Sequence, residues 1–261
     1  MTRLDGKVAL VTGASTGIGR AIARAFAKEG ASLAIVSRTR SQLDKVVDEI
    51  GAAGGKALAV VADVTDRSAV EAGIEKANVS LGPISLLVNN AGLAGPYGPV
   101  GVVDPDVWWQ SQAIHVYGTL LFMSAIIPGM RERKSGCIVN IASAGGLIVA
   151  PNLSSYCVAK ATAIRLTEHV DAETKPDGVR AFVVQPGTIV TDMARDSIND
   201  PQAKKWVPFL VDDLSAIIDK DPTADLERLG KQVVALASGK YDGLAGAYLD
   251  LEQDLDELVQ K

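Results

Sequence analysis

The chain has 261 residues, a net charge of −5, 48% hydrophobic residues and 22% charged residues. These values are ordinary for one soluble domain, and the acidic balance argues against a nucleic-acid-binding surface. No apolar run reaches the ~20 residues that would span a bilayer, and residues 1–6 lead straight into a strand without the features of a signal peptide. Cys137 and Cys157 fall in a predicted strand and a predicted helix, so we expect no structural disulfide and a cytoplasmic protein.

A glycine-rich turn follows the first predicted strand, residues 7–12, and opens an amphipathic helix that ends near residue 30. The turn has the spacing G-x-x-x-G-x-G, and its candidate binding residues are Gly13, Ser15, Thr16, Gly17, Ile18 and Gly19. Glycines let a backbone approach a diphosphate closely, and a helix N-terminus offers N–H groups and a positive dipole. The turn therefore predicts a dinucleotide phosphate site, with a plain tight turn as the alternative.

Strands and helices alternate along the rest of the chain. Further strands are predicted at 32–37, 56–61, 84–88, 137–141, 179–185 and 247–251, with helices at 43–53, 66–80, 104–133, 156–175 and 225–236. Such alternation demands parallel pairing with right-handed crossovers. The predicted fold is a single doubly wound α/β domain over residues 1–261, Rossmann-type, with a seven-stranded parallel sheet and helices on both faces.

Polar residues follow several predicted strands, at the edge where such sheets bind ligands. Ser37 and Arg38 end the second strand, and Asp63 and Val64 end the third. Asp63 has an alternative role as a helix cap, although Thr65 or Asp66 also fits that role. The run Asn89-Asn90-Ala91-Gly92 ends the fourth strand. Its amides can tie that strand end to its neighbour, and an Asn-rich turn is the alternative.

The stretch from Cys137 to Lys160 carries the candidate chemistry. A buried strand ends just before Ser143, and Tyr156 and Lys160 stand four residues apart on one face of the next helix. A cation beside a phenol favours phenolate and lowers the phenol pKa from its ordinary ~10, which would suit acid/base catalysis. A chance Tyr–Lys pair on a solvated helix is the alternative.

The order Ser143, Tyr156, Lys160, together with the glycine-rich turn, resembles the short-chain dehydrogenase/reductase family. The resemblance covers nearly the whole chain and implies the strand order 3-2-1-4-5-6-7. It implies hydride transfer between a nicotinamide cofactor and a secondary alcohol or ketone. In that reaction Ser143 binds the carbonyl oxygen, Tyr156 is the general acid/base, and Lys160 lowers the Tyr156 pKa. A catalytically silent NAD(P)-binding sensor or scaffold is the alternative.

The same resemblance assigns further cofactor contacts. Asp63 and Val64 would meet the adenine, Asn90, Ala91 and Gly92 would line the cofactor path, and Tyr156 and Lys160 would hold the nicotinamide ribose. On the nicotinamide side it implies Pro186, Gly187, Ile189 and Thr191. Where NAD-preferring relatives carry an acidic residue, this chain has Ser37 and Arg38, which suit a 2′-phosphate and predict NADP. The alternative is that Arg38 and Arg40 are solvated loop charges.

His115 stands where relatives usually have an asparagine that supports a proton relay to the active-site lysine. Two interpretations remain open. His115 is either a catalytic proton carrier or a neutral, structural residue that secures a distortion of its helix.

The remaining expectations concern surfaces. Residues 192–221, without a strong period, correspond to the family's substrate lid, and 93–103 is expected to be a loop over the site. The acidic tail 253–261 is expected to be helical and either solvated or docked on a neighbouring subunit. The resemblance implies a homo-oligomer, dimer or tetramer, through the helices at 104–133 and 156–175. No metal site, nucleic-acid partner or membrane partner is expected.

Overall fold

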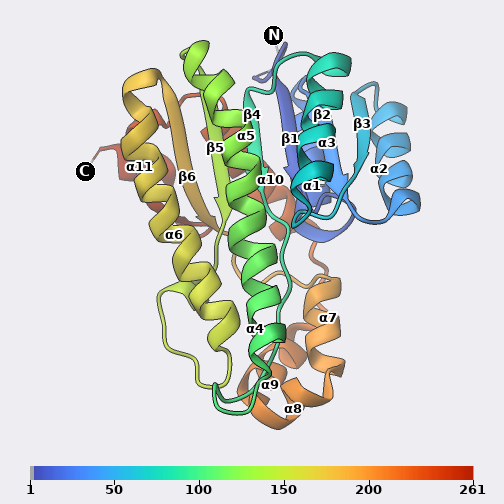
Figure 1. Ribbon diagram of the computed structural model, residues 1–261, viewed down its shortest axis with the longest axis vertical. Helices are drawn as coiled ribbons and strands as arrows, with labels where there is room; N and C mark the ends of the chain where they lie inside the picture. The colour runs from blue at the N-terminus through green and yellow to red at the C-terminus, as the bar shows by residue number, and fades with distance from the viewer. Residues whose placement is uncertain (1–2, 261) are drawn as a thin grey trace.

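One sheet of seven parallel strands, in the order β3-β2-β1-β4-β5-β6-β7, forms the centre of the computed structural model, which describes residues 3–260 (Figure 1). The strands are nearly all apolar and buried on both faces, as expected when helices cover both sides of a parallel sheet. The predicted fold class and strand order are confirmed. The strands are β1 (Val8–Thr12), β2 (Ser32–Ser37), β3 (Lys56–Val61), β4 (Leu86–Asn89), β5 (Gly136–Ile141), β6 (Val179–Gln185) and β7 (Tyr248–Asp250).

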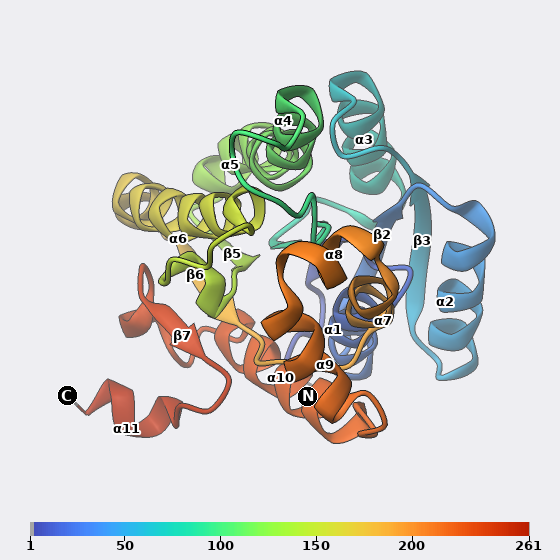
Figure 2. The ribbon, with the colours of Figure 1, turned by 90° about the horizontal axis from the view of Figure 1, so that it is seen from below.

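Two layers of helices enclose the sheet (Figure 2). On one face α1 (Gly17–Lys28), α2 (Arg40–Ala52) and α10 (Thr223–Ala237) share a hydrophobic core with the strands. On the other face lie α3 (Arg67–Leu81), α5 (Gly118–Glu132) and α6 (Ser154–Thr174). Helices thus cover both faces of the sheet, so polar ligands can bind at the edge where the strands end.

The helix predicted over 104–133 contains a distortion. It consists of α4 (Pro105–Gln112), a π-helical turn (Ala113–Tyr117) and α5, and His115 lies inside the π turn. Asp104 caps its start, because its side chain accepts hydrogen bonds from the N–H groups of Asp106 and Val107. By length and composition this span is the one helix within residues 3–260 that is apolar enough to cross a membrane. Its side chains Leu121, Phe122, Ile126 and Met130 are buried in the core beside the sheet.

The region predicted as a lid folds into three short helices, α7 (Asp192–Asn199), α8 (Pro201–Trp206) and α9 (Pro208–Ile217). They lie together beyond the carboxyl ends of the strands, at the lower end of the molecule in Figure 1. Asp200 caps α8 by accepting from the N–H groups of Gln202 (2.6 Å) and Ala203 (3.1 Å). Proline opens both α8 and α9, so each helix is started by its own local signal.

The acidic tail forms α11 (Leu255–Val259), which Asp254 caps. Leu255 is buried in the core and Leu258 packs against it, while Asp256 accepts hydrogen bonds from Lys240 Nζ (2.7 Å) and Tyr241 Oη (2.9 Å). Most residues of the tail are exposed, as the solvated alternative expects, while one face of the helix packs on its own chain. Lys261, the last residue of the predicted tail, lies outside the described residues, as do Met1 and Thr2 of the predicted domain.

Candidate active site

The glycine-rich turn is folded tightly against the end of β4. Gly13 and Gly17 have positive φ angles of 64° and 50°. A Cβ atom at Gly19 would lie 2.3 Å from the carbonyl oxygen of Gly13, so only glycine fits there. Asn90 Nδ2 donates to the carbonyl oxygens of Thr12 (3.0 Å) and Gly13 (3.2 Å). These hydrogen bonds fix the conformation of the turn, which faces the N-terminus of α1.

The Asn-rich run after β4 does more than form a turn. Thr12 Oγ1 accepts hydrogen bonds from the N–H groups of Asn90 (3.0 Å) and Ala91 (3.1 Å), which joins the ends of β1 and β4. The tie that the sequence predicted is made by the Asn90 side-chain amide, and these backbone hydrogen bonds add to it. Gly92 is explained differently, because a Cβ atom there would lie 2.4 Å from Cε1 of His115. Its missing side chain therefore makes room for the imidazole.

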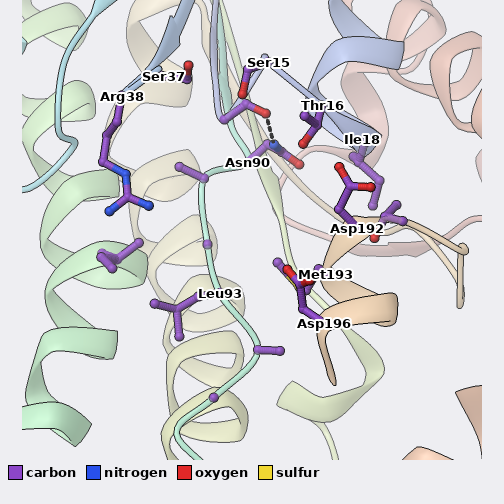
Figure 3. Close-up of a pocket in the computed structure, with 18 of the residues that line it drawn as sticks. Ser15, Thr16, Ile18, Ser37, Arg38, Asn90, Leu93, Asp192, Met193 and Asp196 are labelled. Atoms are coloured by element: carbon purple, nitrogen blue, oxygen red, sulfur yellow. Dashed lines mark hydrogen bonds between the residues drawn. The ribbon is translucent and has the colours of Figure 1, made fainter. Parts of the chain in front are cut away.

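A cavity of about 740 Å³ runs from the ends of β2 and β3, past the glycine-rich turn, to the lid. Figure 3 shows Ser37 and Arg38 at one end, Asn90 beside the turn, and Asp192 and Asp196 of the lid at the other end. Most of the predicted cofactor residues line it, namely Gly13, Ser15, Thr16, Gly17, Ile18, Ser37, Arg38, Asp63, Val64, Asn90, Ala91, Gly92 and Thr191. Gly19, Pro186, Gly187, Ile189, Ser143, Tyr156, Lys160 and His115 lie outside its lining.

Asp63, at the β3 end of the cavity, is held in place by its neighbour. Its carboxylate accepts from Thr65 N–H (2.9 Å) and Thr65 Oγ1 (2.7 Å), and these hydrogen bonds lower its pKa, with a smaller contribution from Arg38. The alternative of Asp63 as a helix cap is wrong, since Asp66 caps α3 by accepting from the Ala69 N–H. Arg38 is exposed at the cavity wall, and among residues 3–260 no carboxylate forms a salt bridge with it.

The segment after β6 borders the opposite side of the turn. Gly187 has a φ of 76°, and its N–H donates to the side-chain oxygen of Gln185. Ile189 is buried, and Thr191 lies against the glycine-rich turn, with its Cγ2 3.2 Å from where a Cβ of Gly17 would stand. Pro186 and Gly187 thus turn the chain from β6 toward the cavity and into α7.

Ser143 and the Tyr156–Lys160 pair meet beside this cavity. Ser143 follows β5, and its Oγ accepts from the Gly145 N–H at 3.1 Å. Tyr156 and Lys160 come from the first turns of α6. Lys160 Nζ donates to the carbonyl oxygen of Ile141 (2.8 Å) and lies 5.6 Å from the centre of the Tyr156 ring. The three side chains are therefore neighbours, as their spacing predicted.

The ionisation of Tyr156 differs from the expectation. Burial raises its pKa, and a hydrogen bond with Ser143 opposes that rise. The predicted lowering by Lys160 is wrong for this structure, because the ammonium is directed to the Ile141 carbonyl and burial disfavours phenolate. Burial also lowers the pKa of Lys160, to about 8. Tyr156 is consequently a phenol, which can donate a proton.

His115 is buried and contacts the loop over the site. Its Nε2 lies 2.8 Å from the carbonyl oxygen and 3.1 Å from the N–H of Leu93. Its ring stands edge-on to Tyr156 with centres 6.0 Å apart. Burial first, and Lys160 second, lower the pKa of His115 to about 3. A neutral imidazole agrees with the interpretation of His115 as a structural residue.

A second cavity, of about 10 Å³, lies between His115 and Lys160. Asn89 and Asn140 contribute to its wall, and Asn89 Nδ2 donates to Asn140 Oδ1 at 2.8 Å. Asn89 Oδ1 is buried without a hydrogen-bond partner among the described residues. The size and polarity of this cavity suit a single water molecule.

Several cavity residues were absent from the sequence prediction. They come from the loop after β4 and from the lid, and include Tyr97, Asp192, Met193, Asp196, Ser197, Asp200 and Gln202. The loop and lid carry no periodic pattern, so only the isolated aromatic of the loop, Tyr97, offered a signal. Among residues 3–260 no group of His, Cys, Asp or Glu side chains could hold a metal ion.

Comparison with known proteins finds a match between residues 7–202 and the family model described as short chain dehydrogenase. A short chain dehydrogenase of Pseudocercospora fijiensis is 37% identical over 202 residues, 76% of this chain but 65% of that protein. A Xanthobacter autotrophicus protein named inactive 2-(S)-hydroxypropyl-CoM dehydrogenase 2 is 38% identical over 80% of this chain and 82% of its own length.

Solved structures agree with this match. A putative short-chain dehydrogenase/reductase from Burkholderia xenovorans superposes with a TM-score of 0.85 at 31% identity, covering 96% of both chains. A metagenomic short-chain oxidoreductase in complex with NADP has a TM-score of 0.74 at 28% identity, covering 91% of this chain and 93% of that one.

Proposed function

The chain belongs to the short-chain dehydrogenase family, and we propose that this oxidoreductase transfers a hydride between NADP(H) and a secondary alcohol or ketone. One observation carries the proposal. Ser143, Tyr156 and Lys160 converge beside a long cavity that a glycine-rich turn also lines. A proton donor and a dinucleotide-sized groove are the two parts that carbonyl reduction requires.

The residues fit a dinucleotide. Gly13, Gly17 and Gly19 leave a cradle that any Cβ would fill, at the N-terminus of α1. In this proposal that turn holds the diphosphate, Asp63 and Val64 bound the adenine, and Tyr156 and Lys160 hold the nicotinamide ribose. The nicotinamide side is formed by Asn90, Ala91, Gly92, Pro186, Gly187, Ile189 and Thr191. The bound nicotinamide supplies or accepts the hydride.

The preference for NADP rests on the end of β2. Ser37 and the exposed Arg38 stand where a carboxylate would be needed to bind a free ribose hydroxyl. A guanidinium can grip a phosphate with two hydrogen bonds. The metagenomic oxidoreductase solved with NADP gives this choice independent support.

The protein side chains then act as follows in the reductive direction. Ser143 donates a hydrogen bond to the carbonyl oxygen and places it beside the phenol. Tyr156 gives its proton to that oxygen as the alcohol forms. Lys160, with a pKa of about 8, keeps a positive charge near the phenolate that is left. His115 stays neutral and secures the loop at Leu93.

We further propose a cytoplasmic homo-oligomer that pairs through the 104–133 and 156–175 helices. Large apolar side chains of these helices are exposed in the single chain. Trp109 is 68% exposed, and Val107, Tyr117, Leu120 and Val158 are each at least 39% exposed. Burying such a surface is the usual reason for a second copy.

A silent nucleotide-binding sensor or scaffold is the competing function. It is favoured by the relative whose name calls it inactive and by the raised pKa of Tyr156. The retention of Ser143, Tyr156 and Lys160 in one cluster favours the enzyme.

A panel of ketones, followed by loss of NADPH absorbance, separates the two functions. An active enzyme should turn over at least one ketone. NADPH binding in a titration, with no turnover of any ketone or of the matching alcohols with NADP⁺, would support the silent protein instead.

A further inference from the structure

Two side-chain hydrogen bonds and one apolar cluster, which contains Ala203 and Val207 of the lid, join the lid to the body. Tyr97 Oη, from the loop after β4, donates to Ser197 Oγ on α7 at 2.7 Å, and Ser197 Oγ donates in turn to the Met193 carbonyl at 2.8 Å. At the other end Asn152 Nδ2 donates to the Trp206 carbonyl at 2.9 Å. Among the helices and strands, α7, α8 and α9 pack chiefly on one another. The position of the lid therefore depends on this apolar cluster together with the polar contacts from the loops.

Tyr97 joins the lid to the catalytic helix. Its side chain is 7% exposed, and with Ser197 it lines the large cavity. Its ring belongs to an apolar cluster that includes Leu153 and Cys157 of the α6 region and has Tyr156 packed against it. The hydroxyl of Tyr97 thus reaches α7 while its ring rests beside the proposed proton donor.

We propose that Tyr97 is a positioning residue that holds α7 over the cavity through Ser197, so that the substrate is enclosed against Tyr156. The kinetic consequence rests on the proposed function, whereas the hydrogen bond that fastens the lid does not. Loss of the phenol oxygen leaves the ring and the apolar cluster in place. The lid would then open more often, without a change in the fold.

The size of the effect follows from one hydrogen bond. Removing a neutral bond of this kind shifts an equilibrium by about two- to tenfold. Tyr97→Phe and Ser197→Ala delete opposite partners of the same bond. Both should give this shift, and the double variant should be no worse than the more affected single variant.

Limited trypsin digestion of the full chain measures lid opening directly. Lys204 and Lys205 are exposed on α8, and cleavage after them requires the lid to open locally. Fragments identified by mass spectrometry should appear about two- to tenfold faster in Tyr97→Phe and in Ser197→Ala. The matched control is Tyr241→Phe, since Tyr241 is also 7% exposed and its hydroxyl bonds Asp256 near the C-terminus. It should be cleaved within the lid at the wild-type rate.

Cleavage at the wild-type rate in both single variants would overturn the proposal. A double variant whose cleavage rate rises by the product of the two single increases would also overturn it. With a turned-over ketone, KM should rise about two- to tenfold in both singles while kcat changes less, because a loosened lid weakens enclosure. Faster cleavage with unchanged KM would refute the positioning role. If wild type turns over nothing, the proposed function fails and the positioning role fails with it, while the cleavage rates still decide whether Tyr97 fastens the lid.

Discussion

His115→Asn tests how a buried imidazole contributes to stability. In the folded chain burial and Lys160 lower the pKa of His115 to about 3, and its Nε2 contacts the backbone of Leu93. An asparagine amide is also able to donate to the Leu93 carbonyl, but it does not titrate. The variant should therefore keep most activity and lose one source of pH dependence.

The magnitude follows from proton linkage. An unfolded histidine has a pKa of about 6.5, so below that pH the unfolded chain binds a proton that the folded chain excludes. The stability that this neutral histidine contributes is fully present above pH about 6.5 and is lost as the pH falls toward about 3. Between about pH 7.5 and about pH 5 the loss from this one group is about 2 kcal/mol.

Urea unfolding at these two pH values measures the loss. Wild type should lose about 2 kcal/mol more than His115→Asn between them. His169→Asn is the matched control, because His169 is the other histidine of the chain and is exposed on α6. It should follow wild type. Equal pH dependence in wild type and His115→Asn would refute the reasoning.

His115→Leu separates the hydrogen bond from the charge. It fills the space but leaves a part-buried Leu93 carbonyl without its partner, at a cost of about 1–3 kcal/mol at any pH. His115→Asn should cost less at neutral pH. If His115→Asn abolishes activity, or removes a titration of kcat near neutrality that wild type has, then His115 is a proton carrier and not a structural residue.

The remaining predictions concern the cofactor groove. Arg38→Ala should weaken NADPH binding about tenfold or more while changing NADH binding little, and Ser37→Asp should shift the preference toward NADH, both read by fluorescence titration. A wild type that already uses NADH with the higher kcat/KM would contradict this. Gly19→Ala places a Cβ 2.3 Å from the Gly13 carbonyl oxygen, so it should abolish cofactor binding and lower Tm. Unchanged binding in that variant would show that the turn is not the diphosphate cradle.

The sheet was predictable because each buried strand is a short apolar run, and the strand order came from the family resemblance. The turn was predictable because its conformation and close contacts require glycine, and the sequence shows glycine at 13, 17 and 19. A helix distortion at His115 was one of the two interpretations drawn from the sequence. Its form, a π turn, was not predictable, because the apolar pattern of 104–133 continues through it.

The lid and the ionisation of the site depend on tertiary contacts. The helices α7, α8 and α9 are six to ten residues long, too short for a periodic pattern to stand out. Tyr97 meets Ser197 across a hundred residues of sequence. The pKa of Tyr156 follows its burial and the direction of Lys160, which donates to Ile141. The spacing of residues along a helix predicts neither the Tyr97–Ser197 contact nor the pKa of Tyr156.

Comparison of wild type with Tyr156→Phe, using NADPH and a reducible ketone, measures whether Tyr156 is the proton donor. Turnover should fall by about a hundredfold or more, because the phenol is the general acid. NADPH binding, measured by fluorescence on the same samples, should remain within a small factor of wild type. Substantial turnover by Tyr156→Phe with intact cofactor binding would contradict the assignment of Tyr156 as the proton donor.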